Sequence, residues 1–218
     1  MSLLSALLLG LFLGMRHATD ADHVVAVTTL VARRRGARAA LSIGALWGLG
    51  HGLTLLVVGG SIILLGLAVP PRLGLVLELG VALMLIALGT VNLFSAASHA
   101  APATGARDGQ RLRSLGIGVV HGLAGSAAVA LLVLSTIQHA GWALVYLLCF
   151  GAGTIVGMAG LTAAMSVPLA AAARRFGSLE QQLAHLTGAL SVAFGIFLVY
   201  QIGFVDGLFA VGPSWAPH

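Results

Sequence analysis

The chain alternates between long apolar stretches and short polar breaks. Six stretches have the length of membrane spans, namely residues 3–31, 41–68, 73–97, 114–137, 142–172 and 182–204. A helix needs about 20 mostly apolar residues to cross the hydrocarbon core of a bilayer. Several stretches are longer than this, which predicts tilted or kinked helices. The pattern therefore predicts an all-α integral membrane protein with six transmembrane helices in a single domain, residues 1–218.

The composition agrees with this interpretation and excludes other classes. Of the 218 residues, 59% are hydrophobic and only 8% are charged, whereas soluble domains carry about 25% charged residues. This excludes an ordinary soluble enzyme and a disordered chain. The basic residues are scattered arginines, so we expect no nucleic-acid partner. The single cysteine, Cys149, excludes a disulfide framework and a cysteine-rich metal site.

The arginines indicate the orientation in the membrane. Nine of them fall between predicted spans 1 and 2, 3 and 4, or 5 and 6: Arg33, Arg34, Arg35, Arg38, Arg107, Arg111, Arg113, Arg174 and Arg175. Only Arg72 falls in a loop on the other side. Because cytoplasmic loops carry an excess of arginine and lysine, both termini are expected outside and the arginine loops, including 98–113, inside the cell. The apolar run 3–15 lacks a basic leader region, so it is interpreted as part of the first span.

Short matches suggest an internal repeat. The matched segments are 14–17 with 118–121, 52–54 with 160–162, and Gly89 with Gly195. They occur in the same order in both halves, at offsets of 104, 108 and 106 residues. Three spans per half would make the second copy inverted, as in many transporters whose binding site lies between the halves. We therefore expect inverted repeats of three helices each, at about 3–97 and 114–204.

A polar cluster interrupts the first span. Residues 16–23 read Arg-His-Ala-Thr-Asp-Ala-Asp-His, and each ionisable group at mid-bilayer costs roughly 3 kcal/mol on insertion scales. Histidine and aspartate together suit Ni²⁺, Co²⁺, Zn²⁺, Cu²⁺ or Mn²⁺. Arg16 and Asp20 have the spacing of a helical ion pair. This favours His17, Asp22 and His23 as direct ligands, with Asp20 supporting one of them.

The geometry of a straight helix conflicts with such a site. His17, Asp22 and His23 would point in different directions around a helix that turns about 100° per residue. They can share one ion only if the helix is broken, so we predict a break at residues 18–21. The alternative is a structural network of ion pairs without a metal.

Other polar residues lie at a similar depth. His51 lies between two glycines in the second span, and His121 matches His17 in the repeat. Both are candidates for the site, and the Thr54 hydroxyl is a weaker one, because hydroxyls in membranes commonly bond to backbone. Glu78, near the outer end of span 3, could attract cations. Glycines spaced by four predict close helix packing, and they occur at 10 and 14, at 44, 48 and 52, at 118 and 122, and at 153 and 157.

Residues 16–23 resemble the RHAxDADH signature of the nickel/cobalt transporter family. The segment around His51 resembles the second motif of that family. The likeness is to its short, six-span branch, often described as urease accessory proteins or nickel permeases. It implies transition-metal transport, with His17, Asp22 and His23 binding the metal and His51 assisting. The segments 121–128 and 157–165, where the family has acidic motifs, contain no aspartate or glutamate here.

These features predict a secondary transporter that takes up Ni²⁺ or Co²⁺ as its substrate and uses no cofactor. Export is disfavoured because the loop 98–113 contains only His99, whereas related exporters are associated with a histidine-rich loop. The alternatives are an intramembrane metalloenzyme, disfavoured by the absence of HExxH, and an accessory subunit that delivers nickel. The expected partners are the metal ion, the lipid bilayer and proteins that mature nickel enzymes.

Overall fold

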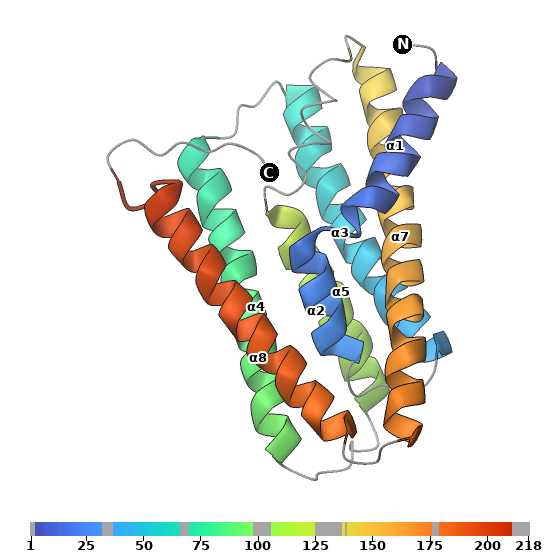
Figure 1. The fold of residues 1–218 in the computed structure, drawn as a ribbon. Coiled ribbons are helices and arrows are strands. Elements are labelled where there is room, and N and C mark those ends of the chain that lie inside the picture. Colours follow the sequence, from blue (N-terminus) through green and yellow to red (C-terminus); the bar gives the residue numbers. More distant parts are fainter. Residues whose placement is uncertain are drawn as a thin grey trace.

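The structure is a computed structural model that describes residues 3–31, 37–65, 70–97, 106–124, 137, 139–175 and 179–210. These residues form seven α-helices and a short π-helix. The elements are α1 (Leu3–His17), α2 (Ala21–Val31), α3 (Ala37–Leu65), α4 (Pro71–Ala97), α5 (Ala106–Leu123), α7 (Ala140–Arg175), α8 (Leu179–Tyr200) and the π-helix η2 (Gln201–Val205). Figure 1 shows them as a bundle of elongated helices.

Four helices in the described residues are long and apolar enough to cross a membrane: α3, α4, α7 and α8 with η2. Two shorter apolar helices, α1 and α2, lie end to end where one first span was predicted. α5 starts at residue 106, within the predicted loop 98–113, so the helix includes polar residues that were expected in the loop. It ends at Leu123, and most of the rest of the predicted fourth span lies outside the described residues. The apolar helices indicate a membrane protein, while the count of six spans stays a prediction.

The predicted break in the first span is confirmed, because α1 ends at His17 and α2 begins at Ala21. The turn is tight: the amide of Thr19 donates to the Arg16 carbonyl at 2.9 Å, and that of Asp20 to the His17 carbonyl at 3.1 Å. The Thr19 hydroxyl also donates to the Arg16 carbonyl, at 2.6 Å. A side chain that bonds to the backbone in this way competes with the backbone hydrogen bonds of a regular helix.

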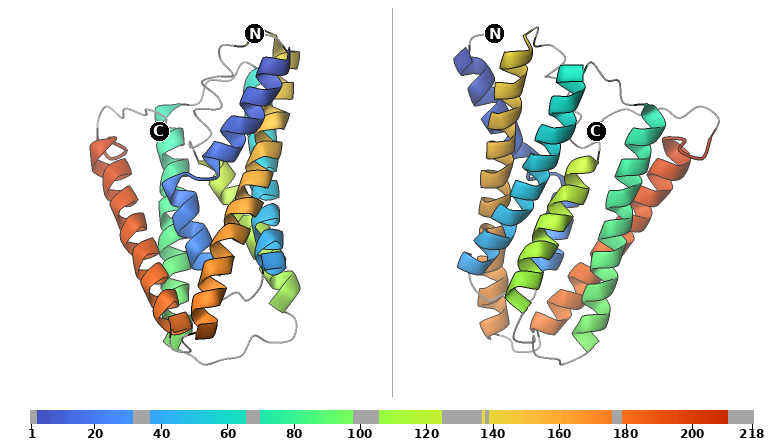
Figure 2. Two further views of the ribbon diagram at one scale, coloured as in Figure 1. Left: turned by 45° about the vertical axis from the view of Figure 1, so that its right-hand side comes forward. Right: turned by 180° about the vertical axis from the view of Figure 1, so that it is seen from behind.

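The helices divide into two closely packed groups. α1, α3, α5 and α7 form one group, in which α3 packs against α5 and α7, and α1 against α7. α4 and α8 form a separate pair, and α2 lies between the two groups, in contact with α4, α7 and α8. The two further views in Figure 2 show the same separation.

Glycines at the predicted positions let the helices approach closely. A Cβ atom added to Gly48 of α3 would lie 2.7 Å from Ile155 Cα of α7. One added to Gly122 of α5 would lie 2.7 Å from the His51 carbonyl oxygen of α3. Real Cβ atoms do not approach other atoms so closely, so glycine is required at both positions. The prediction that these glycines serve helix packing is confirmed.

α1 and α2 run in the same direction and the helices after them alternate, so the start of α1 and the end of α8 lie at the same end of the bundle in Figure 1. The helix ends that carry most of the arginines, namely the starts of α3 and α5 and the end of α7, lie at the opposite end. This arrangement agrees with the prediction that the arginine-rich segments between spans 1 and 2, 3 and 4, and 5 and 6 lie on one side of the membrane. The side of the membrane that each end faces stays a prediction.

The first helix of each half packs on the other half in a similar way: α1 packs on α7, and α5 packs on α3. Gly89 and Gly195, a matched pair, both lie in the contact between α4 and α8. Gly52 and Gly160, another matched pair, differ: Gly52 faces Gly151, whereas a Cβ on Gly160 would meet nothing within 4 Å. The inverted repeat therefore stays a prediction.

Candidate metal centre

The break between α1 and α2 brings two helix ends together inside the bundle. His17 is the last residue of α1, and Asp22 lies in the first turn of α2. The carboxyl end of a helix favours cationic groups and the amino end favours anionic ones, so both residues suit the local field. A discontinuous helix of this kind exposes polar groups that a continuous span would bond internally.

Asp20 holds the imidazole of His17 in one tautomer. Its Oδ2 accepts a hydrogen bond from His17 Nδ1 at 2.8 Å. A carboxylate can only accept, so Nδ1 carries the proton and Nε2 presents a lone pair. That Nε2 lies 3.1 Å from Nε2 of His51 on α3. The predicted pairing of Asp20 with Arg16 is replaced by this contact, because the helix break removes the regular spacing that the prediction assumed.

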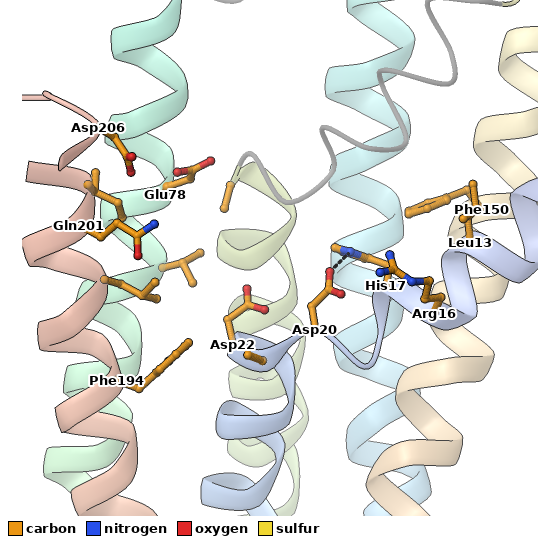
Figure 3. A pocket seen from close by; sticks show the side chains of 15 residues that line it. Leu13, Arg16, His17, Asp20, Asp22, Glu78, Phe150, Phe194, Gln201 and Asp206 are labelled. Carbon is orange, nitrogen blue, oxygen red and sulfur yellow. Dashed lines mark hydrogen bonds and ion pairs between the residues drawn. The ribbon is translucent and has the colours of Figure 1, made fainter. Parts of the chain in front are cut away.

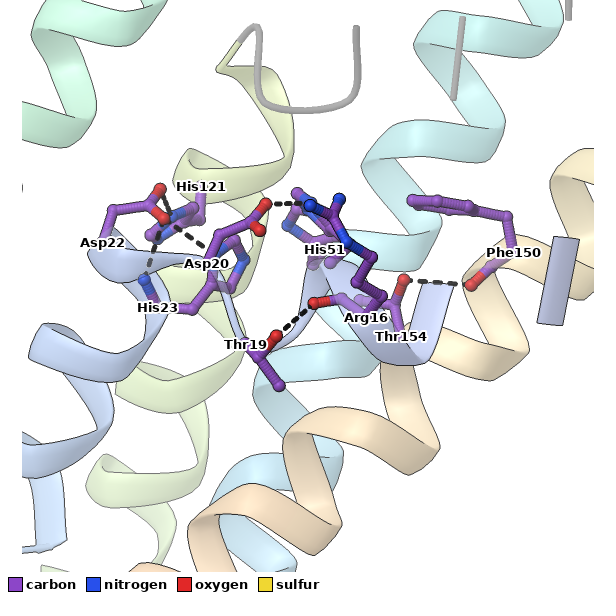
Figure 4. Close-up of polar contacts among 10 residues, drawn as sticks. Arg16, Thr19, Asp20, Asp22, His23, His51, His121, Phe150 and Thr154 are labelled. Carbon is purple, nitrogen blue, oxygen red and sulfur yellow. Dashed lines mark hydrogen bonds and ion pairs between the residues drawn. The ribbon is translucent and has the colours of Figure 1, made fainter. Parts of the chain in front are cut away.

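Asp22 orients two further histidines. Its Oδ1 accepts from His23 Nδ1 at 3.0 Å and from the His23 backbone amide at 2.9 Å. Its Oδ2 accepts from Nε2 of His121, on α5, at 2.6 Å. By the same reasoning His23 is left with a bare Nε2 and His121 with a bare Nδ1. Figure 4 shows Asp22, His23 and His121 gathered where α2 meets α5.

These four histidines are buried, and three of them have unsatisfied ring nitrogens. His23, His51 and His121 are completely buried, and His17 is 5% exposed. His23 Nε2, His51 Nδ1 and His121 Nδ1 have no hydrogen-bond partner among the described residues. A buried polar atom without a partner costs about 1–3 kcal/mol. In His23 and His121 the other ring nitrogen bonds Asp22, and in His51 it contacts His17. Buried histidines oriented in this way, each with one bare nitrogen, are what a metal site without its metal presents.

The candidate ligands fall into two triads, which we call site A and site B. Site A consists of His17, His23 and His51, and site B of Asp22, His23 and His121. Within each triad, one ligand atom per residue lies within 4.8 Å of the others. His23 belongs to both.

The spacing in site A fits a transition metal. Two nitrogens bound at about 2.1 Å would be about 3.0 Å apart at a right angle and about 3.4 Å apart in a tetrahedron. The Nε2 atoms of His17 and His51 lie 3.1 Å apart. A shift of the His51 proton from Nε2 to Nδ1 would leave both Nε2 atoms with lone pairs and would convert this hydrogen bond into a pair of ligands with little movement of the rings.

Two other residues named from the sequence lie outside both triads. The Thr54 hydroxyl donates to the carbonyls of Gly50, at 3.0 Å, and Val119, at 3.3 Å. It therefore bonds the backbone of α3 and α5, as membrane hydroxyls commonly do. Arg16 is exposed and lines the neighbouring cavity.

A cavity of about 360 Å³ adjoins the cluster. Figure 3 shows how it extends from His17 and Asp20 past Asp22 to Glu78, Gln201 and Asp206. Within the described segments, four of the six acidic residues of the chain line it: Asp20, Asp22, Glu78 and Asp206. With a liquid volume of about 30 Å³ per water, the cavity has room for an ion with most of its hydration shell.

The structure adds neighbours of the cluster that were not predicted as site residues. Trp47 stacks on His23, with ring centroids 5.6 Å apart, and Phe150 packs on His17 at 5.5 Å. Gln201 and Asp206 line the cavity from the π-helix and the residue after it. An acidic residue just beyond the sixth apolar stretch was a usable signal for Asp206, because such residues are rare near spans.

The fold and the cluster together define a helical membrane protein with a candidate metal centre. In sequence the chain is similar to urease accessory protein UreH from Bacillus sp. (strain TB-90), to which it is 36% identical over 219 aligned positions that cover 95% of this chain and 96% of the relative. The chain therefore belongs to the family of this urease accessory protein. The name of that relative is the name of an accessory protein and not of an enzyme. No protein-family model matches the chain. No solved structure matches it either.

Proposed function

We propose that this chain is a secondary transporter that carries Ni²⁺ or Co²⁺ into the cell through the histidine cluster. The observation that carries the proposal is the set of four buried histidines, three of them oriented by Asp20 and Asp22, at a helix break in the bundle. Imidazole suits nickel and cobalt. The resemblance of residues 16–23 to the nickel/cobalt transporter signature and the urease-related name of the relative support the same metal.

The cavity supplies the approach in this mechanism. A hydrated cation enters from the end of the bundle that contains the start of α1, attracted by Glu78 and Asp206. It exchanges water for the Asp22 carboxylate and the imidazoles. The donors thus change from oxygen to nitrogen along the path, which favours nickel and cobalt over magnesium and calcium at the inner position.

The membrane potential supplies the driving force. An inward-moving charge gains about 2.3 kcal/mol per 100 mV, so a divalent ion gains roughly 4.6 kcal/mol. This corresponds to a few thousandfold accumulation without nucleotide hydrolysis, in agreement with the absence of a GxxxxGK[ST] sequence. The mechanism requires the arginine-rich helix ends to lie in the cytoplasm.

A second candidate function is nickel delivery by an accessory subunit that binds the ion without conducting it. The name of the relative, an accessory protein, favours this alternative. Both functions need the metal centre, but only transport needs an ion path across the membrane.

The test is uptake of radioactive Ni²⁺ by purified protein in liposomes under an imposed negative potential. We expect uptake by the wild type and a loss of tenfold or more in His17→Gln and in Asp22→Asn, because binding-site changes of this kind cost about 10–100-fold. His139→Gln is the matched control, since His139 is an exposed histidine before α7 and should leave uptake unchanged. Binding without uptake in the wild type would favour delivery and refute transport. Equal uptake by all variants would refute the site.

A further inference from the structure

Sites A and B overlap in a way that one fixed metal position does not explain. Each triad brings three ligand atoms within 4.8 Å of one another, but the four histidines do not form a single such group among the described residues. The ring centroids of His51 and His121 are 6.1 Å apart, whereas that of His23 lies 5.5 Å from His51 and 4.1 Å from His121. His23 is therefore the residue that links the two triads.

We propose that site A and site B are two successive positions of one transported ion, which moves between them by exchanging ligands around His23. This inference rests on the proposed function. An ion that leaves one site keeps His23 as a ligand while it gains the partners of the other site. Conduction requires sites that bind the ion well enough to admit it and weakly enough to release it, and adjacent sites with a shared ligand meet that requirement.

The helices around the cluster suit such an exchange. His51 and His121 lie on α3 and α5, which pack through Gly118 and Gly122 with almost no space between their backbones. These two imidazoles are therefore held as one unit. His23 lies in the first turn of α2, outside that unit, because α2 packs mainly against α4, α7 and α8. A small shift or ring rotation of His23 relative to the unit would favour one site over the other.

The two sites differ in charge and in donor atoms. Site A offers three imidazoles, whereas site B offers two imidazoles and the Asp22 carboxylate. Two divalent cations so close together would repel each other strongly at low dielectric. We therefore expect one bound ion per chain at equilibrium, distributed between the two sites.

His121 has a specific role in this scheme. It is completely buried, its Nδ1 has no partner in the part of the chain that the structure describes, and its Nε2 contacts Asp22 at 2.6 Å. Its loss should eliminate site B and leave site A intact. The loss of His51 should have the reverse effect. The two variants thus confine the ion to different positions.

The test compares His51→Gln and His121→Gln with the wild type, all purified in detergent and titrated with Co²⁺. X-ray absorption of the bound cobalt should show three imidazoles in His121→Gln, and two imidazoles with a carboxylate in His51→Gln. We expect one bound ion per chain in each variant at saturating Co²⁺. Uptake of Ni²⁺ in liposomes should fall by about tenfold or more in both, since changes around a metal site typically cost 10–100-fold.

Several results would overturn the two-position scheme. The same cobalt ligands in both variants would contradict it, as would wild-type uptake by either variant. Loss of binding in one variant with full binding and uptake in the other would indicate a single site. A wild-type protein that binds neither Co²⁺ nor Ni²⁺ would instead refute the proposed function. If a glutamine variant does not elute as folded protein, the pair His51→Asn and His121→Asn provides the same comparison with smaller side chains.

Discussion

The packing of α5 against α3 should control metal binding, and Gly122→Ala tests this most directly. A Cβ at this position would lie 2.7 Å from the carbonyl oxygen of His51, 2.9 Å from Thr54 Cβ and 3.1 Å from His51 Cα. Ordinary contact begins at 3.4 Å, so α5 must move away from α3 by about 0.7 Å. Backbone atoms form part of the contact, and they cannot rotate away as a flexible side chain could.

This displacement is large compared with the tolerance of a metal site. Metal–ligand distances usually vary by no more than about 0.2 Å, and a shift of about 0.7 Å at Gly122 moves the adjacent His121 relative to His51. We expect the affinity for Ni²⁺ to fall by about tenfold or more and the free energy of unfolding to fall by about 1–3 kcal/mol from overpacking. Equilibrium dialysis with radioactive Ni²⁺ and thermal unfolding in detergent measure the two effects.

Gly116→Ala is the matched control on the same helix. A Cβ at Gly116 would meet nothing within 4 Å, and alanine is the better helix former by up to about 1 kcal/mol. This variant should bind Ni²⁺ like the wild type and be equally or slightly more stable. If Gly122→Ala matches Gly116→Ala in both affinity and stability, the close approach of α5 to α3 does not position the site.

Three further predictions concern the carboxylates and the hydroxyl near the cluster. Asp20→Asn should lower the affinity for Ni²⁺ by about 10–100-fold, because asparagine no longer fixes the tautomer of His17; an unchanged dissociation constant in equilibrium dialysis would argue against that role. Glu78→Gln combined with Asp206→Asn should raise the apparent KM of uptake by up to about tenfold and weaken its salt dependence; a lower maximal rate at constant KM would count against a steering role. Thr54→Val should lower stability by about 0.6 kcal/mol in thermal unfolding and leave Ni²⁺ affinity unchanged, and weaker metal binding would instead make this hydroxyl a ligand.

The break in the first span was predictable because its signal is local. Five ionisable residues lie within positions 16–23 of an apolar stretch, and the cost of placing them in lipid is independent of the rest of the fold. The incompatible directions of His17, Asp22 and His23 on a straight helix then required a break. The structure has it, between His17 and Ala21.

The partners of the two carboxylates were not predictable in the same way. Sequence spacing paired Asp20 with Arg16, but that spacing applies only to a continuous helix, and Asp20 contacts His17 across the turn. Asp22 was expected as a ligand, whereas in the structure its two oxygens also orient His23 and His121. The second of these contacts joins residues 99 positions apart, and no local pattern encodes it.

The residues that line the end of the cavity far from the histidines were not predictable, because they lie in and just after an irregular helix. Gln201 and Asp206 line the cavity at the end of α8, where five residues adopt a π-helix. Such segments often occur at functional sites, but hydrophobic periodicity does not predict them. The sequence therefore identified Glu78 as a candidate for attracting cations and did not identify Gln201 and Asp206, which line the same end of the cavity (Figure 3).

The glycines and the buried histidines meet the same structural requirement, which is that imidazoles from several helices converge. An imidazole is a short side chain, and helices usually pack with axes 8–10 Å apart, so rings from four helices can converge only if some backbones approach more closely. His51 lies between Gly50 and Gly52, and His121 lies between Gly118 and Gly122. Most of these glycines face the backbone of a neighbouring helix at distances that exclude a Cβ. Thus a buried histidine flanked by such glycines predicts a site between helices more strongly than either feature alone.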